Sequence, residues 1–242
     1  EKLSGYVNFK VGGPADILLI PNSKEQVIKS IKICKENNIP FYLIGNGSNI
    51  LVRDGGFRGV VISLKKVNNI TVKDDKIIAD CGAMLKAVSD KAMENSLTGF
   101  EFACGIPGTI GGAVFMNAGA YDGEISHVIE SADVINEDGK VVTLTKDELD
   151  FGYRSSLVMK KGYVVLSATF ALKKGTVKTI KELIDDLTNK RESKQPLEYP
   201  SAGSTFKRPT GYFAGKLIQD AGLKGYSIGG AAVSEKHSGF VI

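Results

Sequence analysis

Apolar residues recur along this chain with two spacings, one typical of amphipathic helices and one typical of strands. The helical spacing predicts a helix after Ser23, a second over 85–92 and a third over 177–187. The first helix has a capping box, because Gln26 follows Ser23 at the third position. Short apolar runs predict strands at 41–44, 59–64, 70–72, 76–79, 133–136, 140–144 and 163–172.

The order of these elements predicts an α+β protein built from three parts. Residues 1–65 would form a small α+β unit, 66–174 a second one, and 175–242 a third. The third part becomes irregular after its helix, where proline and glycine interrupt the stretch 196–211. Loops of this kind carry function more often than helices do, so this stretch is a candidate for the site.

Composition and charge narrow the class of protein. No apolar run reaches the ~18 residues of a membrane span, so we expect a soluble protein without membrane contact. The net charge of +4 comes from scattered lysines and gives no support for nucleic-acid binding. Cys34, Cys81 and Cys104 are widely spaced, which favours the reducing cytoplasm over a disulfide framework. His127 and His237 lack metal-ligand spacing, so we expect no metal.

Two glycine-rich loops carry the clearest candidate chemistry. One reads Gly45-Asn46-Gly47-Ser48-Asn49, and the other, within Cys104–Glu124, contains Pro107-Gly108-Thr109-Ile110-Gly111-Gly112. Glycine lets backbone N–H groups approach a ligand closely, so the pair predicts one large anion held between the loops. The third glycine of G-x-G-x-x-G is missing and the segment after Gly47 reads as a strand, which argues against the Rossmann class, and the absence of the P-loop lysine motif excludes a P-loop.

Several motifs in order over nearly the whole length resemble one family. They are Asn8–Ala15, Ile44–Asn49, Gly105–Ala113, Asn117–Tyr121, Tyr153–Ser156 and Pro200–Lys207. Together they are similar to the UDP-N-acetylenolpyruvoylglucosamine reductases, flavoproteins of peptidoglycan precursor synthesis. The resemblance implies FAD clamped between two small α+β units, as in the vanillyl-alcohol oxidase-like flavoproteins, and a third unit that binds the UDP-sugar substrate. It also implies NADPH as co-substrate, and no obligate protein partner is evident.

The resemblance also implies roles for individual residues. Both glycine loops would hold the pyrophosphate of noncovalent FAD through backbone amides. Arg154 matches the cation that stabilises charge developing on the substrate, and Ser204 matches the proton donor. Taken alone, Ser204 reads as a turn hydroxyl, and Arg154 as a solvated residue or a partner of Asp150. Candidate substrate-binding residues are Tyr121, Lys194, Lys207, Arg208 and His237.

Two departures from the family pattern concern the end of the chain and one insertion. The family's catalytic glutamate belongs to a segment beyond Ile242, and neither Glu198 nor Glu235 matches its motif. The apolar run 240–242 reads as the middle of a strand, so we expect the C-terminal end to be incomplete. No tyrosine-loop insertion is evident over 163–176, as in the shorter subtype. Two alternatives stay open: an FAD-dependent alcohol or sugar oxidase, and a non-catalytic sugar-nucleotide-binding module.

Overall fold

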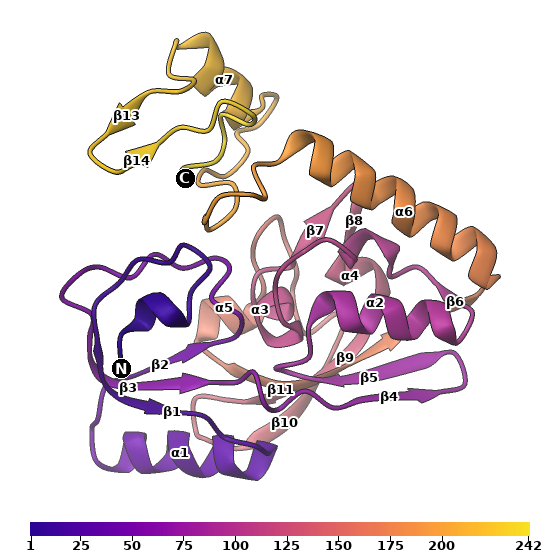
Figure 1. Cartoon of the computed structure of the whole chain (residues 1–242). Coiled ribbons are helices and arrows are strands. Elements are labelled where there is room, and N and C mark those ends of the chain that lie inside the picture. Colours follow the sequence, from indigo (N-terminus) through magenta and orange to yellow (C-terminus); the bar gives the residue numbers. More distant parts are fainter. The chain divides into compact units, whose positions relative to one another are not determined.

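A computed structural model describes all 242 residues and has the mixed helices and strands of an α+β protein (Figure 1). The helices are η1 (Leu3–Gly5), α1 (Lys24–Glu36), α2 (Leu85–Glu94), η2 (Glu101–Ala103), α3 (Ile110–Phe115), α4 (Ile125–Val128), α5 (Leu157–Lys161), α6 (Val177–Lys194) and α7 (Ala214–Asp220). None of them combines the length and the apolar character that crossing a membrane requires.

The strands fall into two larger sheets and three two-stranded pairs. They are β1 (Ala15–Leu19), β2 (Phe41–Ile44), β3 (Phe57–Ser63), β4 (Ile70–Lys73), β5 (Lys76–Asp80), β6 (Leu97–Thr98), β7 (Gly119–Ala120), β8 (Gly123–Glu124), β9 (Ile129–Ile135), β10 (Val141–Thr145), β11 (Val164–Ala171), β12 (Lys173–Lys174), β13 (Ser227–Ile228) and β14 (Ala231–Ala232). The predicted strands are all present in outline, whereas β1 and the short pairs were not predicted.

The chain divides into two compact units. The first unit comprises Glu1, 15–46 and 57–188, and the second unit comprises 2–14, 47–56 and 189–242. Within the first unit, the two larger sheets occupy separate stretches of sequence, one before residue 65 and one after it. The division into three parts at residues 65 and 174 stays a prediction.

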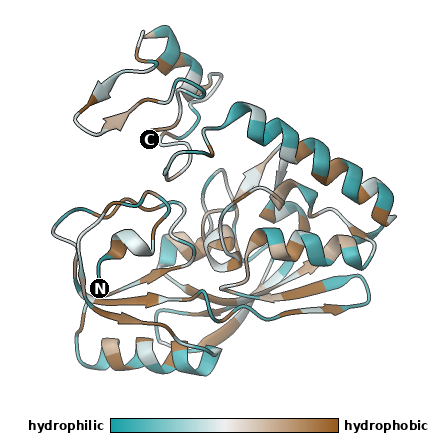
Figure 2. Cartoon of the chain, in the orientation of Figure 1, coloured by the Kyte–Doolittle hydropathy of each residue, from teal (hydrophilic) through white to brown (hydrophobic).

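The smaller sheet of the first unit has the order β1-β3-β2, and both pairings are parallel. Helix α1 joins β1 to β2 and begins at Ser23, whose side chain accepts a hydrogen bond from the Gln26 backbone at 3.3 Å. The predicted cap at Ser23 is therefore present, but the Gln26 side chain accepts from the Asn22 N–H at 2.8 Å, one residue before the capping-box position. Val27 and Ile31 of α1 belong to the same buried cluster as Ile62 of β3. Figure 2 shows these strands as mostly hydrophobic, as expected for a parallel sheet covered by a helix.

The larger sheet has the order β10-β9-β11-β5-β4 and is antiparallel throughout. The hairpins β4–β5 and β9–β10 are those that the sequence predicts. A second capping box follows β10, where the Thr145 backbone donates to Glu148 at 2.8 Å. Helix α3 lies against β11, and the buried rings of Phe100 and Phe170 meet edge-on with centroids 5.0 Å apart. This core fixes the position of the glycine-rich segment that contains α3.

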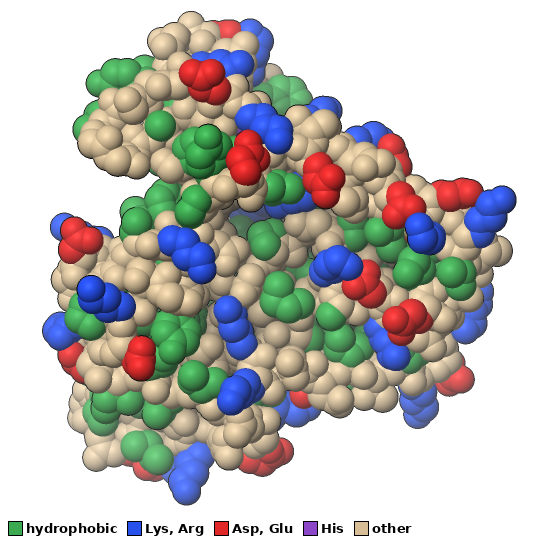
Figure 3. Space-filling model, in the orientation of Figure 1, with side chains coloured by type: hydrophobic (Ala, Val, Ile, Leu, Met, Phe, Trp, Pro, Cys, Tyr) green, Lys and Arg blue, Asp and Glu red, His purple; other side chains and the backbone are tan.

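The second unit has little regular structure and is held by backbone hydrogen bonds. The Asn8 N–H donates to the Gly47 carbonyl at 3.0 Å, and the Gly13 N–H to the Arg53 carbonyl at 3.0 Å. Near the C-terminus, Ala232 and Ile242 exchange two backbone hydrogen bonds of 2.9 Å. Phe240 and Val241 also form isolated bridges, but residues 240–242 are not part of a strand, which differs from what their apolar run predicts. On the face drawn in Figure 3, basic side chains are scattered among acidic ones.

Candidate active site

The two predicted anion-binding loops touch each other in the first unit. Gly45 follows β2, and Thr109 immediately precedes α3, where it forms an isolated bridge with Met84. The Asn46 side chain donates to the Pro107 carbonyl at 2.8 Å. A Cβ added to Gly45 would lie 2.2 Å from Thr109 Oγ1, so only glycine permits this approach. The structure thus brings together the two loops that the sequence singled out separately.

The rest of the first loop belongs to the second unit and also depends on glycine. Gly47 has a φ of +64°, and a Cβ there would lie 2.4 Å from the Tyr6 carbonyl oxygen and 2.7 Å from Val7 Cα. Both the backbone conformation and the close contact therefore require glycine at this position. Ser48 is half-buried and Asn49 is exposed.

The second loop uses some of its predicted amides for its own structure. The Ile110 N–H donates to the Ala83 carbonyl at 2.9 Å, and the Gly111 N–H donates to the Cys81 carbonyl at 2.8 Å. These two amides hold α3 against the turn that follows β5, so they are already used within the fold. The other predicted amides of this segment belong to Gly108, Thr109 and Gly112.

Arg154 is anchored to the glycine-rich segment. It lies in a tight turn with a φ of +53°, a conformation that costs energy for any residue with a side chain. Its guanidinium donates to the Asn117 carbonyl at 3.2 Å and to the Gly119 carbonyl at 2.9 Å. It also lies 5.2 Å from the ring centroid of Tyr153. Two of its five N–H groups are thereby fixed to backbone carbonyls.

Behind Arg154 lies a polar network that the sequence did not reveal. Asn117 is completely buried, and its side chain donates to the Glu124 carboxylate at 3.0 Å. Ser126 donates to the same carboxylate oxygen. Partial burial pushes the pKa of Glu124 upward, but these two hydrogen bonds and the nearby charges of His127 and Arg154 outweigh it and lower that pKa. In the sequence, the only indication of this network is an acidic residue at the end of the glycine-rich segment.

Ser204 and His237 lie together in the second unit. Ser204 pairs with Phe240 in an isolated antiparallel bridge, and the next amide, of Thr205, donates to the Gly239 carbonyl at 2.8 Å. A Cβ on Gly239 would be 2.9 Å from His237 Cε1 and 3.7 Å from Ser204 Oγ. His237 Nδ1 accepts a 3.1 Å hydrogen bond from the Gly239 N–H. Ser204 is exposed, and both its hydroxyl and the imidazole of His237 lie near Gly239.

The other predicted substrate-binding residues are exposed or partly exposed. Arg208 stacks on Phe213, with its guanidinium carbon 3.9 Å from the ring centroid. Lys207 and Lys194 are exposed, the latter in the last turn of α6. Tyr121 is 39% exposed and occupies the β7–β8 turn with a φ of +52°, which is unusual for so bulky a residue.

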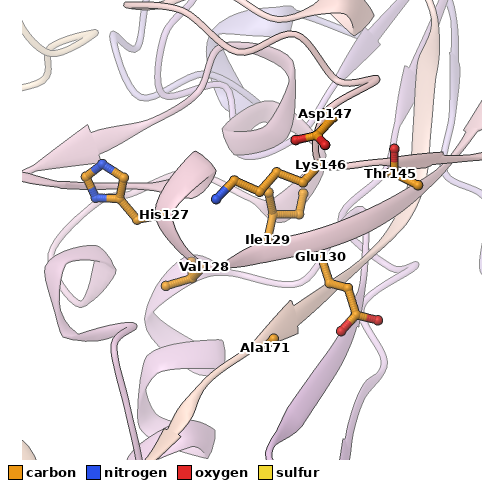
Figure 4. Close-up of a pocket in the computed structure, with 8 residues that line it drawn as sticks. All are labelled: His127, Val128, Ile129, Glu130, Thr145, Lys146, Asp147 and Ala171. Carbon is orange, nitrogen blue, oxygen red and sulfur yellow. The ribbon is translucent and has the colours of Figure 1, made fainter.

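A separate depression of about 440 Å³ opens on the surface of the first unit (Figure 4). Its walls come from the start of β9, the end of β10 and the end of β11. Its lining residues are His127, Val128, Ile129, Glu130, Thr145, Lys146, Asp147 and Ala171. None of these is a predicted site residue.

Comparison with known proteins identifies relatives of this chain. The FAD binding domain family matches residues 15–145, and the UDP-N-acetylenolpyruvoylglucosamine reductase C-terminal domain family matches 195–242. A UDP-N-acetylenolpyruvoylglucosamine reductase of Clostridium perfringens is 67% identical over 240 residues, which are 99% of this chain and 79% of that protein. One of Clostridium beijerinckii is 67% identical over 241 residues, with coverage of 100% and 79%.

Solved structures agree as well. The crystal structure of the UDP-N-acetylenolpyruvylglucosamine reductase of Thermus caldophilus is 33% identical with a TM-score of 0.85, covering 100% of this chain and 86% of that one. An alkyldihydroxyacetonephosphate synthase shares the fold over 65% of this chain and 31% of its own, at 16% identity and a TM-score of 0.51. From the identities and coverage of its relatives, the chain belongs to the UDP-N-acetylenolpyruvoylglucosamine reductase family.

Proposed function

We propose that this protein uses NADPH and FAD to reduce the enolpyruvyl group of UDP-N-acetylglucosamine enolpyruvate, forming UDP-N-acetylmuramate for peptidoglycan precursors. Within the structure, the observation that carries the proposal is the contact between the two glycine loops at Gly45 and Thr109. Such a contact brings the backbone amides of the two loops close together, and clustered backbone amides are donors that suit a diphosphate group. The residues present therefore fit FAD.

The chain's own part in holding FAD is backbone donation and exclusion of water. Amides of Gly45–Asn49 and those of Gly108, Thr109 and Gly112 are the proposed pyrophosphate donors. Neither loop contains a histidine, so the binding is noncovalent. When bound, FAD supplies hydride transfer from NADPH to the enolpyruvyl double bond.

Arg154 stabilises the negative charge that develops on the substrate carboxylate once the double bond has received a hydride. A fixed cation accelerates the reaction when it meets more charge in the transition state than in the ground state. The Asn117 and Gly119 carbonyls hold the guanidinium in one orientation before substrate binds. That preorganisation removes the cost of reorienting the cation during the reaction.

Ser204 then donates the proton that completes reduction. A serine hydroxyl is a weak acid, so it protonates only a strongly basic enolate-like carbon, and the resulting alkoxide needs cationic neighbours. His237 lies beside Ser204 in the second unit, and Lys207 and Arg208 follow it closely in sequence. Lys194 and Tyr121 complete the proposed contacts to the UDP-sugar.

The reaction takes place in the cytoplasm and needs no obligate protein partner in this proposal. All three cysteines are free and buried, which suits a reducing compartment. The substrate is the only partner proposed.

Ser204→Ala tests the assignment most simply. We expect NADPH to reduce the flavin at the wild-type rate, while turnover of the UDP-sugar falls by about 10²- to 10⁴-fold, the usual contribution of a positioned proton donor. Wild-type turnover in this variant would refute the role of Ser204.

The oxidase alternative is favoured if O₂ reoxidises the reduced flavin rapidly and no NADPH is consumed. The binding-module alternative is favoured if the protein binds the UDP-sugar and never turns it over.

A further inference from the structure

Asn117 is the centre of a buried hydrogen-bond network in the first unit. It has a φ of +45° and no exposed surface. Its side-chain nitrogen donates to Glu124 Oε1 at 3.0 Å and to the Gly152 carbonyl at 3.2 Å. Its side-chain oxygen accepts from the Ser126 N–H at 3.0 Å. A buried amide satisfied on both its donor and acceptor sides has one allowed orientation, so the Asn117 backbone is fixed as well.

Both carbonyls that accept from Arg154 are held by this network. One is the backbone carbonyl of Asn117 itself. The other belongs to Gly119, which pairs with Glu124 across the β7–β8 ladder. A Cβ on Gly119 would lie 2.7 Å from Glu124 Cβ, so the two strands approach as closely as glycine allows.

Glu124 contacts the residues that hold both the Asn117 carbonyl and the Gly119 carbonyl. Its Oε1 accepts from Asn117 and from the Ser126 hydroxyl, and its backbone belongs to the strand that pairs with Gly119. Its side chain is 32% exposed and lies 3.9 Å from the imidazole of His127. The lowered pKa of Glu124 means that its neighbours favour the ionised carboxylate, which is the stronger hydrogen-bond acceptor.

We infer that Glu124 is a positioning residue for Arg154: through Asn117 and the β7–β8 pair, it fixes the carbonyls that orient the guanidinium toward the substrate. Glu124 acts through its neighbours and is not itself a catalytic residue. The inference rests on the proposed function, because it needs Arg154 to act on the substrate.

The test compares Glu124→Ala, Glu124→Gln and a control, Glu130→Ala, whose carboxylate is paired with Lys76 on an exposed surface. Each purified, FAD-loaded variant is reduced by NADPH without oxygen and then mixed with UDP-N-acetylglucosamine enolpyruvate. In Glu124→Ala we expect flavin reduction within twofold of wild type and reoxidation by the substrate slower by about 10²-fold, the cost of a ~1 Å misplacement. Glutamine keeps an acceptor oxygen, so Glu124→Gln recovers most of that rate.

A second arm combines Glu124→Ala with Arg154→Ala. If Glu124 acts through Arg154, the double variant is reoxidised no more slowly than Arg154→Ala alone. Additive losses overturn the inference, and so does an unchanged reoxidation rate in Glu124→Ala. Loss of FAD, or equal slowing of both half-reactions in Glu124→Ala and Glu124→Gln, assigns Glu124 to the general fold and also overturns it. Failure of the wild-type protein to be reoxidised by the UDP-sugar is a different result, because it refutes the proposed function.

Discussion

Gly45→Ala is the sharpest perturbation of the proposed FAD site. The new Cβ would lie 2.2 Å from Thr109 Oγ1 and 3.3 Å from both Thr109 Cβ and Cγ2. Thr109 cannot move aside easily, because it is 2% exposed and bridges to Met84. Overpacking of this kind costs about 1–3 kcal/mol. If the strain is relieved by separating the two loops, FAD affinity falls by about 5- to 150-fold, at tenfold for each ~1.4 kcal/mol.

In the assay, apoprotein is titrated with FAD, and binding is measured by the quenching of flavin fluorescence. Gly55→Ala is the matched control, because nothing lies within 4 Å of a Cβ there, and it should bind FAD as wild type does. Thr109→Ala in the Gly45→Ala background removes Oγ1 and Cγ2, so it should restore most of the affinity lost. Undiminished FAD binding by Gly45→Ala would refute the reasoning, as would a double variant that binds no better than the single one.

Three further predictions concern buried or hydrogen-bonded groups. Burial and the charge of Asp80 raise the pKa of Cys81 to about 12, so a thiol reagent at neutral pH should label it only after unfolding, as mass spectrometry can test. The pKa of Glu124 is lower in the folded chain than its unfolded value of ~4.3. Its stabilisation is therefore present above that value and lost as pH falls through the folded pKa, so Glu124→Gln should flatten the acid limb of urea-unfolding stability. Ser156→Ala should cost about 1–3 kcal/mol of unfolding free energy, because it removes a helix cap and the 2.6 Å hydrogen bond that the buried Ser156 hydroxyl donates to the Phe115 carbonyl. The exposed cap variant Ser23→Ala should cost about 1 kcal/mol or less in the same assay.

Elements with local signals could be predicted from the sequence. Helix α1 follows from Ser23 and Gln26, which cap it, and the β9–β10 hairpin follows from Asp138-Gly139 between two apolar runs. Strand β1 (Ala15–Leu19) had no such signal, because it is short, its burial does not alternate between two faces, and it is formed by parallel pairing with β3 far along the chain. Local patterns do not specify such long-range pairing.

The candidate site likewise has features that the sequence could predict and features that it could not. The glycine loops were visible because close backbone approach restricts the residue type, and the Gly45 contact confirms that restriction. The internal use of the Ile110 and Gly111 amides was not visible, because it depends on carbonyls that the fold brings in from another segment. The same holds for Glu124, whose contacts with Asn117 and the charge of Arg154 arise only after folding.

The central claim is tested most directly by a single anaerobic experiment on the FAD-loaded protein. One equivalent of NADPH should bleach the visible flavin absorbance, and UDP-N-acetylglucosamine enolpyruvate should then restore it with formation of one equivalent of UDP-N-acetylmuramate. A flavin that stays reduced after the UDP-sugar is added, and recovers only with O₂, would contradict the account.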